Sequence, residues 1–403
     1  MKNKKRGSYI AEAVQKMPQS GIRKFFDLIE KTEGIISLGV GEPDCITPQP
    51  IREACMKAMT DGRTKYTSNS GLPELREEIS HYLYKSYGIK YDQDQVLVTV
   101  GVSEALDLAL RAIINPGDEV LIGEPCYVSY APNVSLVGGI PVLVPARAKD
   151  GFKLKKKDLI ARINERTKAL LLSYPNNPTG AIMERSDLEE IAQVAKLYDI
   201  MVISDEVYAE FTYGKKHVSF ASLPDMKERT LLLNGFSKAY AMTGWRLGFA
   251  AGPDEIIKAM LKIHQYTMLC APTMSQVAGV SALRDCAAHV REMVAEYDKR
   301  RRFIVKGLNE LGLPCFEPGG AFYVFPRITG TGMTSEEFCE KLLFGEGLAV
   351  VPGNAFGPSG EGHIRCCYAI SQNKMEEALE RLERFLRRYR QTTNTAVLKT
   401  AIQ

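Results

Sequence analysis

Between residues 50 and 285, short apolar runs alternate with longer segments whose apolar residues recur at helical spacing. Most of the runs are rich in valine, isoleucine and leucine, which is typical of strands buried on both faces. They cover residues 96–100, 119–122, 169–174, 200–204, 230–234 and 246–251. Strands that alternate with helices usually form a parallel sheet with helices on both faces. The pattern therefore predicts an α/β fold with a mostly parallel central sheet.

One of the intervening helices is expected at 103–114, because its leucine, alanine and isoleucine residues fall on one face. Ser103 is expected to be the N-cap, since a serine oxygen accepts hydrogen bonds from the first turn of a helix. The sequence Asn115-Pro116-Gly117 ends the helix. The chain is thus expected to turn from strand to helix immediately after Gly101.

A long, charged amphipathic segment from about 290 to 311 leads into a second group of elements. The elements expected there are strands at 321–326, 348–352 and 363–369 and a terminal helix near 373–389. We therefore expect three parts in the chain. They are an N-terminal arm (1–48) that packs with the smaller domain, a large domain (49–290) and a smaller α+β C-terminal domain (291–403).

The composition of the 403 residues is ordinary for a globular protein, with 45% apolar and 25% charged residues. The net charge of +4 is too small to predict a nucleic-acid partner, and no apolar run approaches the ~18 residues that span a bilayer. The nine cysteines form no Cys-x-x-Cys pair and the five histidines show no metal-ligand spacing, so no metal site is expected. An odd number of cysteines in a chain of this length predicts reduced thiols, and the N-terminus has no apolar leader segment. We therefore expect a cytoplasmic protein.

The stretch 237–248 places Lys238 eight residues before Arg246, on a turn of small residues that leads into an apolar strand. A lysine amine bonds covalently to an aldehyde where its surroundings keep it deprotonated. An arginine offers a planar fork that suits a phosphate. Pyridoxal 5′-phosphate (PLP) carries both an aldehyde and a phosphate. The stretch resembles the lysine motif of fold type I aminotransferases, and this resemblance implies PLP as the cofactor.

Three further motifs each follow a predicted strand, where open α/β sheets bind their ligands. They are Gly101–Ala105, Tyr174–Gly180 and Ser204–Tyr208. Together with 237–248, and in this order, they resemble the motifs of PLP-dependent class I/II aminotransferases of fold type I, in the prokaryotic aspartate and aromatic subgroup. The resemblance covers almost the whole chain. It implies a homodimer that moves an amino group from an L-amino acid to a 2-oxo acid by a ping-pong mechanism.

The resemblance also implies roles for the residues around the reacting centre. Lys238 is expected to carry PLP and then to move the proton at the substrate α-carbon. Asp205, at a strand end, is expected to keep the ring nitrogen protonated, so that the ring accepts negative charge. Asn177 and Tyr208 are expected to donate to the phenolic oxygen of PLP.

The rest of the cofactor is assigned in the same way. The residues expected at the phosphate are Gly101, Val102, Ser103, Ser237 and Arg246. Tyr66 is expected to reach the phosphate of the neighbouring subunit, and Tyr127 is expected to stack on the ring. Phe236 stands where some relatives carry a second small hydroxyl residue, so the phosphate is expected to have one donor fewer.

The resemblance implies that Arg365 binds the substrate α-carboxylate. An arginine inside an apolar strand is costly to bury unpaired, which by itself argues for a ligand or for a partner such as a structural salt bridge. The resemblance adds Gly41 and Asn177 to this carboxylate site. No position clearly supplies a cation for a second carboxylate, whereas Tyr66, Tyr127, Ile22 and Phe26 offer apolar surface. We therefore expect aromatic or other neutral amino acids as substrates, with 2-oxoglutarate as the acceptor.

Other functions remain open to different degrees. An aspartate or alanine aminotransferase, or a PLP-dependent C–S β-lyase, would use the same lysine, aspartate and arginine. A transcription regulator with an aminotransferase-like domain would need a DNA-binding segment, and only about twenty residues precede the resemblance at Ser20. A nicotinamide enzyme is not expected, because no Gly-x-Gly-x-x-Gly follows a strand. No nucleic-acid or membrane partner is expected.

Overall fold

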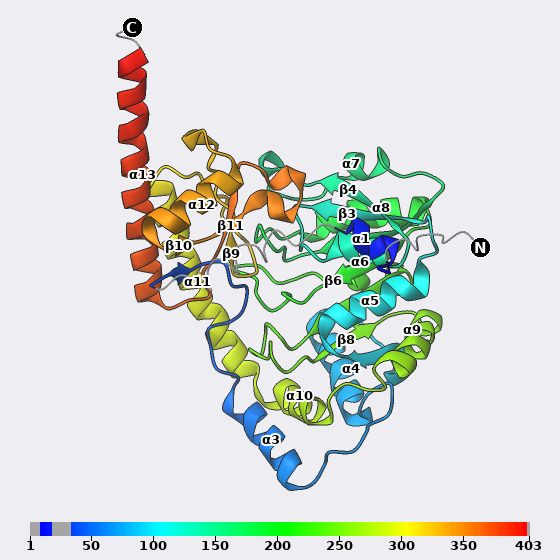
Figure 1. The fold of residues 1–403 in the computed structure, drawn as a ribbon. Coiled ribbons are helices and arrows are strands. Elements are labelled where there is room, and N and C mark those ends of the chain that lie inside the picture. The colour runs from blue at the N-terminus through cyan, green and yellow to red at the C-terminus, as the bar shows by residue number, and fades with distance from the viewer. Residues whose placement is uncertain (1–8, 18–33, 401–403) are drawn as a thin grey trace, which may run out of the picture.

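The computed structural model describes residues 9–17 and 34–400, and a seven-stranded sheet forms its centre (Figure 1). The strands are β2 (Val96–Thr99), β3 (Glu119–Glu124), β4 (Ile140–Pro145), β5 (Thr167–Ser173), β6 (Met201–Asp205), β7 (Thr230–Gly235) and β8 (Gly248–Ala251). Their order is β2-β8-β7-β6-β5-β3-β4, and in this sheet only β8 runs against the others. The prediction of an α/β fold with a mostly parallel sheet is confirmed.

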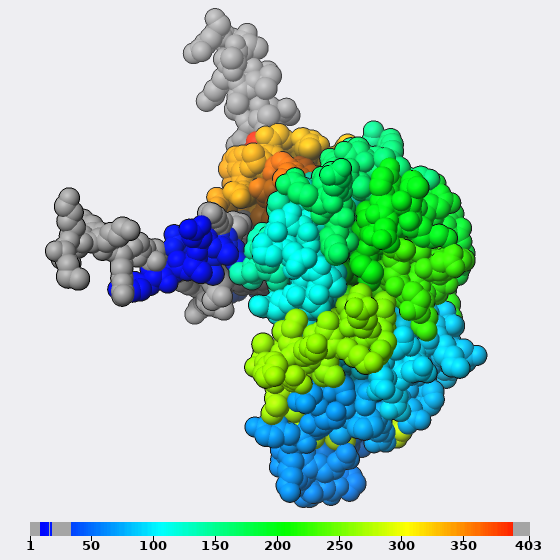
Figure 2. Space-filling model, turned by 90° about the vertical axis from the view of Figure 1, so that its right-hand side faces the viewer, coloured from blue at the N-terminus to red at the C-terminus, as the bar shows by residue number. Residues whose placement is uncertain are grey.

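Helices cover the sheet and extend beyond its ends. They are α1 (Glu12–Lys16), α3 (Gln49–Thr60), α4 (Pro73–Tyr87), α5 (Gly101–Ile113), α6 (Tyr130–Leu136), α7 (Lys156–Ile160), α8 (Arg185–Leu197), α9 (Asp254–Thr267) and α10 (Thr273–Asp285). In Figure 2, α3 (blue) forms the lower end of the molecule, with α9 and α10 (yellow-green) above it. Three clusters of buried apolar residues lie between these helices and the sheet.

Two details of the large domain differ from the prediction, one in the sheet and one at the start of a helix. Strand β4 was not predicted; it contains Pro141 and Pro145, which remove backbone donors, and it lies at the edge of the sheet where proline is tolerated. The prediction that Ser103 caps a helix was wrong. The helix α5 begins at Gly101, and the carboxylate of Glu104 accepts a hydrogen bond from the N–H of Val100.

The C-terminal part forms a second, smaller layer. Its elements are α11 (Ala287–Glu310), β9 (Tyr323–Val324), α12 (Ser335–Glu346), β10 (Leu348–Ala349), β11 (Val351–Pro352), β12 (Ile364–Cys367) and α13 (Gln372–Thr400). Strands β11, β12 and β9 form an antiparallel sheet, and α11 runs from α10 toward it (Figure 1). The terminal helix continues well past residue 389, where it was predicted to end.

The start of the described chain is tied to this smaller layer. Strand β1 (Ile36–Ser37) pairs in parallel with β10, and the N–H of Cys367 in β12 donates to the carbonyl of Leu38. Residues 39–41 are therefore held beside β12, although more than 300 residues separate the two along the chain. The division of the chain at 48/49 and 290/291 stays a prediction.

Candidate active site

A cavity of about 710 Å³ lies at the carboxyl ends of the parallel strands, beside the smaller layer. Predicted site residues that line it are Gly41, Val102, Ser103, Tyr127, Asn177, Asp205, Tyr208, Ser237, Lys238, Arg246 and Arg365. Gly101 does not line the cavity itself, but it packs against Arg246, which does. Tyr66 is outside the cavity, with 81% of its surface exposed. Ile22 and Phe26 lie outside the described residues. The structure thus brings most of the predicted residues into one space.

Lys238 follows β7 and is half-buried in this cavity. Its Nζ donates to the carbonyl oxygen of Gly41 at 2.7 Å. Burial lowers the pKa of Lys238 to about 8, and this effect exceeds the opposing influence of Cys367 and Glu42. At pH 7 about a tenth of this lysine is therefore uncharged, far more than at the ordinary lysine pKa of 10.5, and the uncharged amine is the form that attacks an aldehyde.

Asp205 ends β6 and is buried, with 7% of its surface exposed. Its carboxylate accepts hydrogen bonds from the hydroxyl of Tyr130 at 2.7 Å and from the N–H of Val207 at 3.1 Å. Burial raises the pKa of Asp205, and these two hydrogen bonds oppose the rise. The role of Tyr130 was missed, although the residue stands in the same turn as Tyr127. Asp205 thus offers a buried carboxylate for a cation such as a protonated ring nitrogen.

Tyr208 is paired with a second tyrosine that the sequence did not single out. The hydroxyls of Tyr208 and Tyr323 lie 2.7 Å apart, and the Tyr323 hydroxyl donates to the carbonyl of Gly41 at 3.4 Å. Burial raises the pKa of both tyrosines, so both remain protonated donors. Glycine at position 41 leaves room for this contact, because a Cβ atom there would collide with the Tyr323 hydroxyl and displace it. The aromatic pair Phe322-Tyr323 in a predicted strand was the available signal.

Arg365 lies in β12 with 4% of its surface exposed. Its guanidinium donates to Oδ1 of Asn177 at 3.0 Å and to the carbonyl of Gly39 at 2.5 Å. It is sandwiched between the rings of Tyr323 and Phe356, 4.6 and 4.9 Å from their centroids. Its Nε has no hydrogen-bond partner, and no carboxylate of the described residues forms an ion pair with the group. A buried cation in this state favours an anionic ligand.

The N-terminus of α5 forms an anion cradle against Arg246. Gly101, Val102 and Ser103 are the first three residues of the helix, so their N–H groups have no acceptor within it. Gly101 has φ +72°, and a Cβ on it would lie 2.5 Å from a terminal nitrogen of Arg246. A Cβ on Gly248 would lie 2.6 Å from the carbonyl carbon of Gly101. The two glycines therefore allow the helix start and the guanidinium to converge.

The residue beside Arg246 ties this cradle to the N-terminal segment. Trp245 is the one tryptophan of the chain, and its indole N–H donates to the hydroxyl of Thr47 at 3.1 Å. The Thr47 hydroxyl in turn donates to the carbonyl of Ala241 at 2.6 Å. Thr47 thus fixes the turn between Lys238 and Arg246.

The residues of the cavity fit PLP in kind. An amine of lowered pKa, a buried carboxylate and an anion cradle face one space, and Tyr127 adds an aromatic ring at the rim, 37% exposed.

Within residues 9–17 and 34–400, no group of three or more His, Cys, Asp or Glu side chains is placed to hold a metal ion. No helix in that part of the chain is long and apolar enough to cross a membrane.

Comparison with known proteins agrees with this geometry. The family model described as aminotransferase class I and II matches residues 33–382. An aspartate aminotransferase of Pyrococcus abyssi is 50% identical over 91% of this chain and 96% of its own length. An aromatic-amino-acid aminotransferase of Thermococcus litoralis is 45% identical over 94% and 98%. The crystal structure of an aromatic aminotransferase from Pyrococcus horikoshii superposes with a TM-score of 0.88 at 48% identity, covering 91% of this chain and 99% of that one.

The match extends over most of the chain and over nearly the full length of these relatives. The predicted family, enzyme class and cofactor are therefore confirmed. The chain belongs to the class I and II aminotransferases, the fold type I enzymes that transfer amino groups with PLP.

Proposed function

We propose that the enzyme transfers the amino group of aromatic or other neutral L-amino acids to 2-oxoglutarate, with PLP held by Lys238. Arg365 is the observation that carries this proposal. It is a buried guanidinium without a carboxylate partner among the described residues, and it faces the same cavity as Lys238. An amino acid would supply the missing carboxylate to Arg365. Its α-carbon would then lie toward Lys238. Asn177 and the Gly39 carbonyl already orient the guanidinium.

The other residues act on the group that Arg365 positions. When bound, PLP supplies an electron sink for the negative charge that develops at the substrate α-carbon. Asp205 provides the buried negative charge that keeps the ring nitrogen protonated. Ser237, Arg246 and the amides of residues 101–103 hold the phosphate. Lys238, with its lowered pKa, accepts the α-proton and returns it during transfer.

The substrate preference follows from the cations of the cavity. Lys238, Arg246 and Arg365 are its only lysine and arginine residues in the described part of the chain, and each already has a role. A second carboxylate, whether of aspartate or of 2-oxoglutarate, therefore has no lysine or arginine partner from the same subunit and must face water or the partner subunit, whereas Tyr127 offers an aromatic surface to a neutral amino acid. The Thermococcus litoralis relative is named for aromatic amino acids. Aspartate is the second candidate, because the Pyrococcus abyssi relative is named for it.

Steady-state rates with tyrosine, phenylalanine, aspartate and alanine, each with 2-oxoglutarate, test the proposal. The value of kcat/KM for the aromatic substrates should exceed that for aspartate by at least about 10-fold. Double-reciprocal plots should be parallel, because the first product leaves before the second substrate binds. A higher kcat/KM for aspartate would contradict the substrate assignment. Release of pyruvate and ammonia from a cysteine conjugate without any 2-oxo acid would favour the β-lyase.

We further propose that the enzyme is a homodimer in which Tyr66 completes the phosphate site of the partner. Large apolar side chains are exposed on α3, on the end of α9 and just after it, and they are Met56, Met59, Tyr266, Met268 and Leu269. Hydrogen bonds from Asn69 to Leu269 and from Thr273 to Lys65 hold the segment of Tyr66 against the turn between α9 and α10 and the start of α10. Exposed apolar groups of this kind are typical of a protein interface. A second copy of the chain would cover them.

We propose a cytoplasmic location from the state of the cysteines. All nine are free, and five of them are buried in the apolar interior. Free thiols in this number are typical of a reducing compartment.

A further inference from the structure

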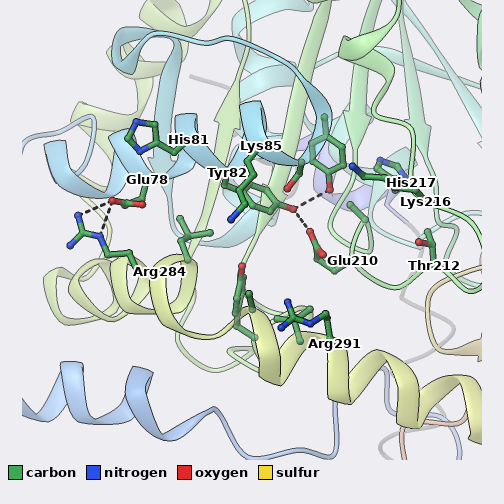
Figure 3. A pocket seen from close by; sticks show the side chains of 17 residues that line it. Glu78, His81, Tyr82, Lys85, Glu210, Thr212, Lys216, His217, Arg284 and Arg291 are labelled. Atoms are coloured by element: carbon green, nitrogen blue, oxygen red, sulfur yellow. Dashed lines mark hydrogen bonds and ion pairs between the residues drawn. The ribbon is translucent and has the colours of Figure 1, made fainter.

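A second cavity, of about 540 Å³, lies apart from the cofactor cavity and shares none of its lining residues (Figure 3). Helix α4, the loop after β6 and the start of α11 enclose it. Tyr82 donates a hydrogen bond to Glu210 at 2.5 Å, and its hydroxyl lies 3.1 Å from that of Tyr87. Burial raises the pKa of Tyr82 well above its ordinary value, so it remains a donor. The cavity therefore has a fixed polar wall.

Three cations around this cavity have no anionic partner among the described residues. They are Lys85 of α4, Lys216 of the loop and Arg291 of α11, and Figure 3 shows them around Glu210. A fourth cation, Arg284, is neutralised by Glu74 at 2.8 Å and Glu78 at 2.7 Å. Three separate parts of the chain thus each bring an unpaired positive charge to one hollow.

The charges around the cavity do not balance. Among the residues that line it, Lys85, Lys216, Arg284 and Arg291 contribute four positive charges and Glu78 and Glu210 two negative charges, while Glu74 lies outside the lining. Two positive charges remain, and their mutual repulsion falls when an anion of charge −2 lies between them. The volume is that of a small-molecule site. Tyr82, Tyr87 and Tyr240 add ring surface for a carbon skeleton.

We propose that this cavity binds a small organic dianion of metabolite size. The site lies behind the segment that carries Asp205 and Tyr208. Tyr208 faces Tyr323 in the cofactor cavity, whereas the next two residues, Ala209 and Glu210, line the second cavity. The ligand would therefore contact the reverse side of the active-site segment together with α11. This binding is separate from amino transfer and does not depend on which amino acid is the substrate.

Calorimetric titration of the PLP-loaded enzyme at low salt tests the site, with succinate and inorganic phosphate as separate probes. Lys85→Ala and Arg291→Ala should each weaken binding by about 5- to 10-fold, because each removes one attractive charge. Lys149→Ala is the matched control, since Lys149 is exposed and lies outside both cavities. Glu210→Gln should strengthen binding several-fold by removing a repulsive charge. A gain of this kind cannot come from misfolding.

The Arg365→Gln variant separates this site from the substrate carboxylate site, and it should retain the second-site binding. Tighter binding of succinate would identify a dicarboxylate as the ligand type, and tighter binding of phosphate a phosphate ester. The proposal would be overturned by the absence of binding of both probes. It would equally be overturned if binding were unchanged in Lys85→Ala, Lys216→Ala and Arg291→Ala, or lost in Arg365→Gln.

Discussion

The pKa of Lys238 is set by its burial and by the charges of a few neighbouring residues. Burial lowers its pKa, Arg365 and Arg246 lower it further, and Glu42 and Cys367 oppose them. Asp205 shows the reverse case, because burial raises its pKa while Tyr130 and Val207 stabilise the charged form. The pKa of Lys238 is thus shifted down and the pKa of Asp205 is shifted up, so both move toward neutral pH.

Covalent attachment of PLP to the cofactor-free enzyme should report the pKa of Lys238. The amine attacks only when it is neutral, so the rate should rise with pH and level off above about 8 rather than near the ordinary lysine value of 10.5. Stopped-flow absorbance measures this rate. A rate that still rises at pH 10 would show that the lysine is not shifted. Lys238→Ala should bind PLP without a covalent bond, and borohydride should then fix no cofactor to the chain.

Asp205→Asn should slow removal of the α-proton by roughly 10²–10³, because a placed charge that stabilises the transition state is lost. Single-turnover rates with an α-deuterated amino acid isolate this step. Wild-type rates in the variant would rule out Asp205 as the partner of the ring nitrogen.

Tyr130→Phe is the matched control, since it removes a hydrogen bond but keeps the carboxylate. That bond lowers the pKa of Asp205, so its loss raises this pKa. The carboxylate is then protonated at higher pH, and the acid limb of the rate profile should move upward while the rate at high pH stays closer to wild type. An unmoved acid limb would show that Asp205 does not set it.

At the scale of elements, the phosphate cradle depends on the contact between the start of α5 and β8. Gly248 opens β8 at a point where the backbone of Gly101 and Val102 leaves no room for a Cβ. A side chain there must push the helix start away from Arg246. Gly244, four residues earlier in the same turn, has open space around its Cβ position.

Gly248→Ala should therefore weaken PLP affinity by at least about 10-fold, since the helix amides and Arg246 no longer converge. Gly244→Ala should leave the affinity near wild type. Fluorescence titration of the cofactor-free proteins with PLP compares the two variants. Equal affinities would mean that the approach of β8 to α5 does not shape the cradle.

Elements whose signals are local were predictable, and contacts between distant residues were not. The motifs at strand ends predicted that Asp205 and Lys238 share one site, and both line the same cavity, because the carboxyl ends of parallel strands meet at one edge. Tyr323 was missed because it meets Tyr208 across 115 positions of the chain. Strand β4 was missed because its prolines suit only a sheet edge, and the order of strands is not written in any one segment.

At the scale of the whole molecule, the site draws on residues from both ends of the chain. The carbonyl of Gly39 and the guanidinium of Arg365, 326 positions apart, form one hydrogen bond. Strand β6 of the large sheet supplies the aspartate, the segment after β7 supplies the lysine, and the smaller layer supplies the arginine. The proposed dimer would add Tyr66 from a second chain.

A hybrid of two inactive variants tests this sharing. Lys238→Ala removes the amine from its own site, and Tyr66→Asp places a negative charge beside the partner's phosphate. In a mixed dimer, the site with an intact Lys238 receives an intact Tyr66, so one full site is restored. Mixing the two variants after mild denaturation should recover about a quarter of wild-type activity, as expected for random pairing of symmetric dimers. No recovery in mixtures that sediment as dimers would contradict the shared site.

The bond between Trp245 and Thr47 has a practical consequence. All tryptophan emission from this chain comes from one indole beside Arg246, so the signal is not averaged over the molecule. Bound cofactor absorbs at the wavelengths where tryptophan emits, so its binding would lower the emission intensity by energy transfer. Detachment of the N-terminal segment would expose the indole to water and shift the emission to longer wavelength. The protein thus carries its own optical reporter for two events at one site, without a label.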